Sequence, residues 1–263
     1  MIRLTFLLRR KPEMSLAEFQ KYWRENHGPL VASHAQHLNI LRYVQVHTLE
    51  EDEARKAQRA ADPRGPMEPP YDGVAELWWN NRAEYVAAGA TTEGRAAGAE
   101  LLEDERKFID LPNSPGYFAY EYPQINPSPE NLVATEMSPL IKLHYPLRHI
   151  ASLTLEEAQL YWRTNHGPII RRNGTTGHIK RYVQVHRFED EIEAEFREAR
   201  GTVVEPYTGH AELWFERSVR TPGAATPEAI LGGRLAYEDE TNFIDFARST
   251  TFHAKERVFI DRR

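Results

Sequence analysis

The chain contains the same segment twice, and this repeat limits its possible folds more than any other feature. Tyr22–Pro29 reads YWRENHGP and returns as YWRTNHGP at Tyr161–Pro168, while RYVQVH occurs unchanged at Arg42–His47 and Arg181–His186. From Ile2 to His47, 21 of 46 positions are identical to the residue 139 positions later. Only two copies are present and each is long, so the repeat indicates a duplicated domain rather than a solenoid.

The boundary between the copies falls in a proline-rich segment. Pro123, Pro127, Pro129 and Pro139 interrupt any regular element there. We therefore predict an N-terminal domain over residues 1–125, a linker over 126–138 and a C-terminal domain over 139–263. Later matches occur at slightly smaller separations, which indicates that the copies share their elements and differ in their loops.

Each copy predicts the order strand, helix, strand, strand, helix, strand. In the first copy the expected strands are 2–8, 40–48, 73–79 and 116–122. The first helix begins with a capping box, Ser15 to Glu18, repeated as Thr154 to Glu157, and we expect Gly28-Pro29 to end it. A second helix is expected within 82–108, and the charged segment 50–70 is expected to be a loop with a short helix at 53–59.

This order is the ferredoxin-like βαββαβ pattern, which places helices on only one face of its sheet. The other face has to be covered, and a second copy in the same chain can cover it. We therefore predict the α+β class, with two antiparallel sheets packed into a single-chain, pseudo-dimeric α/β barrel. Such a barrel needs no partner chain to close, and the sequence does not decide whether two chains form a further homodimer.

Composition excludes several classes of protein. The chain has no cysteine, so it has no disulfide framework and no thiolate metal site. The 33 Lys and Arg against 39 Asp and Glu give a net charge of −6, which argues against a nucleic-acid partner. No apolar run is long enough for a membrane span and no signal peptide is evident, so we expect a cytoplasmic protein without a membrane partner.

Alternation along the strands predicts which side chains point into the barrel. We assign Val44 and Val46 to the helix side, and the polar residues beside them to the inside. The inward set resembles the wall of a cavity for a small hydrophobic molecule. The predicted substrate-binding residues are Tyr43, Gln45, His47, Glu76, Trp78, His144, Tyr182, Gln184 and Trp214. The alternative is a purely structural network of satisfied polar groups between the two sheets.

The second copy carries additional histidines on its inward positions. Thr5 and Val74 of the first copy correspond to His144 and His210, which we place near His186 and Glu212. Three histidines and a carboxylate could hold a divalent metal, but a cluster of neutral imidazoles is the alternative. No tight local ligand motif is present, so we expect no tightly bound metal. We also expect chemistry to be centred on the second copy.

Three motifs in order carry a resemblance to a known family. They are a helix ending in His-Gly-Pro, the sequence Gly-x-Ala-Glu-Leu-Trp, and Asp104-Glu105 shortly before Phe108-Ile109-Asp110. The set resembles the EthD family of the dimeric α/β-barrel superfamily and occurs twice, across nearly the whole chain. The resemblance implies the barrel fold, and it implies lactone isomerase, dehydratase, decarboxylase or oxidoreductase activities, many of them independent of cofactors.

Several residues are candidates for acid–base catalysis. His27 and His166 follow the first helix of each copy, where each either interacts with the last helical carbonyls or acts as an acid or base. Glu212 beside Trp214 would act as a base if burial raised its pKa. The predicted catalytic residues are His186, Glu212, His166, His210 and His27. The Asp-Glu pairs at 104–105 and 239–240 are interpreted as a solvated helix face or cap partners.

No sequence motif indicates a nucleotide, flavin or nicotinamide site, and we expect no cofactor. The sequence therefore predicts an enzyme that isomerises, dehydrates or decarboxylates a small hydrophobic oxygenated molecule by His/Glu proton transfer. One alternative is a cofactor-free oxygenase or oxidoreductase. Another is a non-catalytic barrel that binds a small molecule or serves in a stress response.

Overall fold

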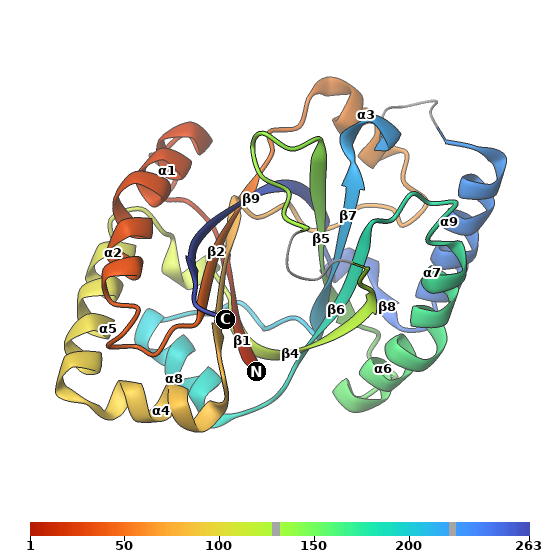
Figure 1. Cartoon of the computed structure of the whole chain (residues 1–263). Coiled ribbons are helices and arrows are strands. Elements are labelled where there is room, and N and C mark those ends of the chain that lie inside the picture. The colour runs from red at the N-terminus through yellow and green to blue at the C-terminus, as the bar shows by residue number, and fades with distance from the viewer. Residues whose placement is uncertain (128–131, 221–224) are drawn as a thin grey trace.

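A computed structural model of the chain describes residues 1–127, 132–220 and 225–263. Figure 1 shows strands in the middle and two groups of helices outside, each made mainly of helices from one half of the chain. Residues 128–131 of the expected linker lie outside the described residues. Within the described residues, no helix has both the length and the apolar character needed to cross a bilayer.

Each half contains the expected order of strands and helices. The first half consists of β1 (Ile2–Leu8), α1 (Leu16–Tyr22), η1 (Trp23–His27), α2 (Gly28–Ser33), β2 (Arg42–Thr48), α3 (Glu53–Ala60), β3 (Gly73–Trp79), α4 (Arg82–Ala90), α5 (Thr92–Glu105), η2 (Leu111–Asn113) and β4 (Gly116–Ile125). The second half consists of β5 (Leu140–His149), α6 (Leu155–Tyr161), η3 (Trp162–His166), α7 (Gly167–Asn173), β6 (Arg181–Arg187), α8 (Glu191–Arg200), β7 (Gly209–Glu216), η4 (Arg217–Arg220), α9 (Pro227–Glu240), β8 (Ile244–Asp245), η5 (Phe246–Arg248) and β9 (Phe252–Asp261).

The strands form one closed antiparallel barrel, which confirms the predicted fold class. Each half supplies a ferredoxin-like sheet, with the order β4-β1-β3-β2 in the first half and β9-β5-β7-β6 in the second. The sheets join where β2 pairs with β9 and where β4 pairs with β6. The fourth strand of each half therefore pairs with the second strand of the other, and neither sheet keeps a free edge.

The first helix of each half begins as predicted but does not end where predicted. The Ser15 and Thr154 side chains accept from the N–H groups of Glu18 and Glu157, and both capping boxes are complete. Gly28-Pro29 does not end the helix, because a π-helical turn (η1) leads directly into α2. Proline is tolerated in the first turn of the new α-helix, since its missing N–H would have no partner there.

The connection between the second and third strands of each half crosses to the other half. We call residues 50–70 the first arm and residues 188–206 the second arm. The first arm, with α3, lies over the second half, whereas α8 of the second arm lies beside α4 and α5 (Figure 1). Ile192 and Phe196 of α8 are buried in the hydrophobic core of the first half. Each half is therefore completed by a segment of its partner half.

The predicted faces of β2 and β6 are wrong. Val44, Val46, Val183 and Val185 point into the barrel, whereas the polar residues between them lie under the helices. There the Trp23 indole N–H donates to the Tyr43 hydroxyl (3.0 Å), and Gln45 Nε2 donates to the Trp23 carbonyl (2.8 Å).

The second half repeats this arrangement, so the correction extends to the whole polar set of both strands. Trp162 donates to Tyr182 (3.1 Å) and accepts from Gln184 (3.0 Å). The helix backbone and the indole supply the polar partners of these residues. The residues moved from the inside to the helix side are Tyr43, Gln45, His47, Tyr182, Gln184 and His186.

His47 and His186 should make the protein less stable in acid. Each ring packs on a tryptophan, Trp23 or Trp162, and Nε2 hydrogen-bonds to a glutamine amide oxygen. Burial lowers the pKa of both imidazoles to about 3, with a smaller effect of nearby arginines. The unfolded chain therefore takes up these protons near pH 6.5 and the folded chain does not.

We expect the free energy of unfolding to fall by about 1.4 kcal/mol per histidine between pH 7.5 and pH 5.5 from this source. Denaturant unfolding of the parent and a His47→Gln/His186→Gln variant at both pH values measures the effect. The variant should lose roughly 3 kcal/mol less than the parent over this interval. Equal pH dependence in the two proteins would contradict the assignment.

Candidate functional site

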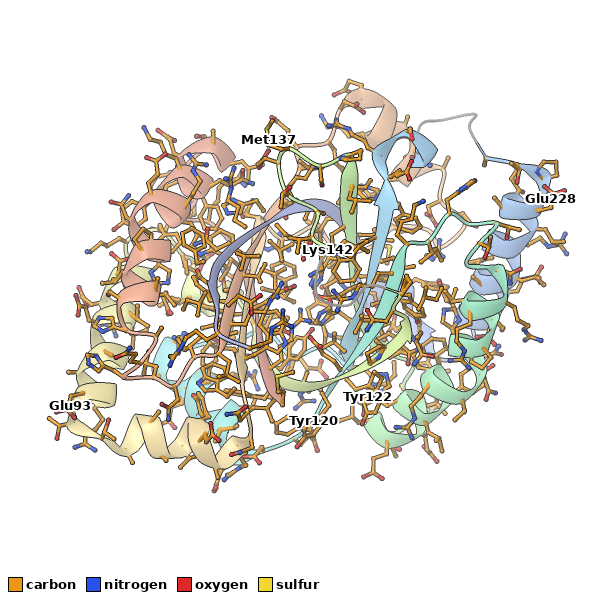
Figure 2. All side chains as sticks on the ribbon, viewed as in Figure 1. Glu93, Tyr120, Tyr122, Met137, Lys142 and Glu228 are labelled. Atoms are coloured by element: carbon orange, nitrogen blue, oxygen red, sulfur yellow. The ribbon has the colours of Figure 1, made fainter. Side chains whose placement is uncertain are left out.

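The barrel interior contains a cluster of buried charges, which we call the interior charge cluster: Arg3, Glu76, Lys142, His144, His210 and Glu212. Lys142 lies near the centre of the molecule (Figure 2), and its Nζ is 2.6 Å from Glu76 Oε1 and 2.8 Å from Glu212 Oε1. Arg3 Nη2 lies 2.7 Å from Glu76 and 2.5 Å from Glu212. These side chains are at most 3% exposed. Trp78 and Trp214 also face inward, where each donates its indole N–H to a glutamate.

The inward positions predicted for Glu76, His144, His210 and Glu212 are therefore correct, but Glu212 does not have the raised pKa expected of a base. Burial alone would raise it, yet Arg3 and Lys142 outweigh burial and hold the pKa of Glu212 well below its usual range. His210 is buried beside His144 and Arg3, so its pKa lies well below the usual value. The cluster has paired charges, and little of it reaches solvent.

Four members of this cluster have ligand atoms that could surround a metal ion. One atom from each of Glu76, His144, His210 and Glu212 lies within 4.8 Å of the others. His186, expected to complete the set, is on the opposite face of the sheet. The carboxylate oxygens already contact Arg3 and Lys142, so an incoming cation would have to compete with two fixed cations.

We expect protein purified without chelators to contain less than one metal ion per ten chains. The reason is that Arg3 and Lys142 already neutralise the two carboxylates. Elemental analysis of the parent checks this, with a His144→Ala variant as the control. Near-stoichiometric zinc, iron or copper in the parent, absent from the variant, would show that the cluster is a metal site.

A cavity of about 920 Å³ lies on the other face of the second half's sheet. The outward side chains of β5, β6 and β7 form its floor, α7 and α9 form its sides, and the first arm reaches over it. Most of the wall is apolar, including Leu143, Leu147, Ile170, Leu213 and Phe215. Volume and lining are typical of a site for a small hydrophobic molecule.

The corresponding space in the first half is filled by aromatic side chains. Phe196 of the second arm meets Phe6 edge-to-face at 5.1 Å, and Tyr85 of α4 packs on Trp79 and Phe118 at 5.0 and 4.9 Å. A Cβ on Gly116 would lie 2.3 Å from the Phe196 ring, so only glycine lets this ring approach β4. In the described part of α3, no aromatic residue corresponds to Phe196.

A histidine–aspartate pair lies at the edge of the cavity. His166 is the last residue of η3, and its Nδ1 is 2.9 Å from Asp239 Oδ2 on α9. The Tyr161 hydroxyl donates to the other oxygen of Asp239 at 2.8 Å. Burial would raise the pKa of Asp239, but the hydrogen bonds from His166 and Tyr161 outweigh it and hold that pKa below its usual value.

Glu240 continues this arrangement. Its carboxylate lies 4.0 Å from His166 Nε2 and accepts from Arg64 Nε of the first arm at 2.7 Å. Because Nδ1 faces the Asp239 carboxylate, the neutral form of the His166 ring places its proton on Nδ1 and its lone pair on Nε2. The arrangement can therefore accept a proton from a molecule in the cavity.

The first half keeps the same polar pairs beside the space that its aromatic side chains fill. His27 Nδ1 lies 2.8 Å from Asp104 Oδ2, and Arg200 of the second arm pairs with Glu105 at 2.8 Å. Asp104 and Glu105 are each 6% exposed. The interpretation of the Asp-Glu pairs as a solvated helix face is therefore wrong, because the histidines and the arms bury them.

Sequence reasoning missed four residues that line or support the cavity: Arg64, Tyr145, Asp239 and Glu240. The recurrence of Asp-Glu at equivalent positions was a usable signal, since a merely solvated pair has no reason to be kept in both copies. Tyr145 corresponds to Phe6, a difference on the outward face of the first strand. Arg64 could not be found this way, because nothing in the repeat shows that the arms cross.

Fold and site together define a fused α/β barrel with an open cavity between the sheet and the helices of its second half. The chain belongs to the EthD family: the EthD domain matches residues 11–112 and 151–247, one segment in each half. No curated protein sequence matches the chain.

Solved structures resemble the whole chain. An anthrone oxidase-like protein aligns with a TM-score of 0.51 at 7% identity, covering 100% of this chain and 94% of that one. A candidate monooxygenase from Lactobacillus acidophilus gives 0.46 at 7%, covering 99% and 95%. A dye-decolorizing peroxidase from Bacteroides thetaiotaomicron gives 0.43 at 8%, covering 96% and 92%. At these identities the likeness extends to the fold alone.

Proposed function

We propose that the second half is an acid–base catalyst that moves a proton on a small hydrophobic, oxygen-containing molecule. The single observation that carries this is the position of His166 on the wall of the 920 Å³ apolar cavity, with Nδ1 held by Asp239 at 2.9 Å. A base needs a fixed tautomer and access to its substrate; the contact with Asp239 supports the first, and the position of His166 on the cavity wall supports the second. The carboxylate of the predicted His/Glu pair is then Glu240 rather than Glu212.

The apolar wall favours a hydrophobic substrate because few polar groups are available to replace the hydration of a charged one. Removal of a proton next to a carbonyl begins isomerisation and dehydration alike. The same carbanion could react with dioxygen in a cofactor-free oxygenase. These reactions differ in their products and in oxygen consumption, whereas the initial proton removal is common to them.

Hydrogen–deuterium exchange tests the proposal without knowledge of the product. Ring-containing ketones and lactones that bind the protein are incubated with it in D₂O, and loss of the α-proton signal is followed by NMR. Oxygen uptake is recorded in parallel. We expect catalysed exchange or turnover for at least one ligand that binds. Ligands that occupy the cavity without exchange or turnover would indicate a binding protein instead.

A variant that fills the cavity should abolish this exchange. Ala236 of α9 occupies the position that Leu101 has in α5, so Ala236→Leu restores the bulkier side chain of the first half. Ala96→Leu, on the exposed face of α5, is the matched control and should exchange at the parent rate. Unchanged exchange in Ala236→Leu would place the reaction elsewhere.

A further inference from the structure

Three positions of the cavity wall carry smaller side chains than their equivalents in the first half, and one polar group is added to the cavity floor. At equivalent positions Trp79 becomes Phe215, Ala97 becomes Gly232 and Leu101 becomes Ala236, each a loss of volume at the cavity wall. At the floor, the Phe6 of the first half becomes Tyr145. The second half therefore has both the additional space for a ligand and a hydroxyl group, that of Tyr145, at the floor of this space.

The Tyr145 hydroxyl donates to no acceptor among the described residues, although the Arg64 guanidinium lies close enough to donate toward its oxygen. The side chain is 6% exposed, so bulk water hardly reaches it. A buried hydroxyl whose proton has no acceptor destabilises the folded chain, and such groups in native proteins call for an explanation. Phenylalanine, present at the same position of the first half, would avoid this cost. A ligand that accepts the hydrogen bond accounts for the tyrosine.

The surroundings of Tyr145 fix its role as a donor. Burial raises the pKa of this phenol well above its usual value, and Glu240 adds to the rise while Arg64 opposes it. The hydroxyl therefore keeps its proton at any physiological pH. A phenol that keeps its proton offers one O–H to an acceptor.

Arg64 brings a positive charge to the same end of the cavity. It comes from the first arm, and its guanidinium pairs with Glu240 at 2.7 Å and lies 5.7 Å from the Tyr237 ring centroid. A hydrogen-bond donor with a cation nearby stabilises negative charge that develops on an oxygen. His166 lies on the wall of the same cavity, so a base and an oxygen-binding group face one space.

We propose that the Tyr145 hydroxyl binds the carbonyl oxygen of the substrate, and that the substrate class is enolisable ketones or lactones with a hydrophobic ring body. This inference rests on the proposed function of His166 as the base. His166 Nε2 takes the proton from the carbon next to the carbonyl. The C–H electron pair becomes the new C=C bond, the C=O π pair moves to the oxygen, and Tyr145 donates to the resulting enolate. The step is redox-neutral, and return of the proton to carbon completes it.

Phenols mimic an enolate oxygen on a flat hydrophobic ring, so they serve as the probe. Binding of 2-naphthol, the more acidic 6-cyano-2-naphthol, and naphthalene is measured for the parent, Tyr145→Phe and Phe6→Tyr. We expect the parent to prefer the naphthols over naphthalene, and the more acidic naphthol most. Tyr145→Phe should bind the naphthols at least 10-fold more weakly and naphthalene equally well. Phe6→Tyr, in the filled half, should match the parent.

The denaturant midpoint of Tyr145→Phe shows whether the Tyr145 hydroxyl serves ligand binding or stabilises the fold. If no protein group accepts the Tyr145 hydrogen bond, Tyr145→Phe should unfold at the same denaturant concentration as the parent or a higher one. A structural hydroxyl would lower that midpoint. Equal naphthol affinity in the parent and Tyr145→Phe, or no naphthol binding by the parent, would overturn the inference.

The two proposals fail in different ways. His166→Ala should keep the naphthol preference while losing exchange, because Tyr145 remains in place. Naphthol preference without any exchange in the parent would refute the acid–base function and leave the Tyr145 site standing. Exchange at the parent rate in Tyr145→Phe would refute the role of Tyr145 and leave His166 as the base.

Discussion

Lys142→Met should lower the free energy of unfolding by about 3–5 kcal/mol, as expected when one partner of a buried ion pair is removed. The ammonium is completely buried and touches Glu76 and Glu212 at 2.6 and 2.8 Å. Methionine fills much of the same space but removes the ammonium from three buried carboxylates, since Lys142 Nζ also lies 3.3 Å from Glu256, and it leaves Arg3 as the neighbouring cation of Glu76 and Glu212. Denaturant unfolding at pH 7.5 measures the loss, and the expected destabilisation is a large part of a typical domain's stability.

An exposed lysine provides the control. Lys180 pairs with Glu216 at 2.9 Å, but both side chains are about 40% exposed. Solvent screens such a pair, so Lys180→Met should cost less than about 1 kcal/mol. Lys142→Met combined with Glu76→Gln removes one charge of each sign and should recover part of the loss. Similar losses in Lys142→Met and Lys180→Met would mean that the interior charges are more hydrated than their burial indicates.

The fold was predictable because duplication and periodicity are local signals. Two ferredoxin-like halves, each with one uncovered sheet face, leave few ways to bury that face in a single chain. The capping boxes at Ser15 and Thr154 predicted where helices start. The end of α1 was not predictable from Gly28-Pro29, since a π-helical turn changes which N–H groups need partners.

The faces of the strands were only half determined by the sequence. A period of two separates Val44 from Gln45, but it does not say which of them meets the helices. Apolar valines suit packing on helices, and this criterion assigns the polar set to the inside of the barrel, whereas the structure has the valines inside. In β2 and β6 the decisive partners are a tryptophan indole and a helix carbonyl, which lie about 20 residues away in sequence. In β3 and β7 the same reasoning placed Glu76 and Glu212 correctly.

The location of the cavity depends on contacts that the repeat cannot reveal. Phe196 fills the first half only because the second arm crosses to it, and Arg64 reaches Glu240 only because the first arm crosses back. The expectation of unequal halves came from His144 and His210 in the barrel interior. The cavity does lie in the second half, but on the opposite face of the sheet, and it is formed by smaller side chains such as Ala236.

Catalysed proton exchange should fall by about 10²–10⁴ in His166→Ala and change little in His27→Ala. Both histidines occupy the same place after a π-helical turn, and both are held by an aspartate at 2.8–2.9 Å. They differ in that His166 lines the open cavity, whereas aromatic side chains fill the equivalent space of the first half. Because the two histidines share their hydrogen-bonding geometry and differ in access to the cavity, a larger effect of His166→Ala than of His27→Ala would be due to access to the substrate.

His186→Ala tests the earlier assignment from sequence against the structure. His186 was expected to be the main acid or base, yet its ring stacks on Trp162 and hydrogen-bonds to Gln184 under the helices. We expect this variant to be less stable than the parent. The exchange rate of its folded fraction should stay within about 10-fold of the parent rate, which is a much smaller loss than removal of a general base causes. Exchange is measured for all three variants at a temperature where each is folded by circular dichroism. A larger loss in His27→Ala than in His166→Ala would place the reaction in the first half, and a 10²-fold loss in folded His186→Ala would restore the original assignment.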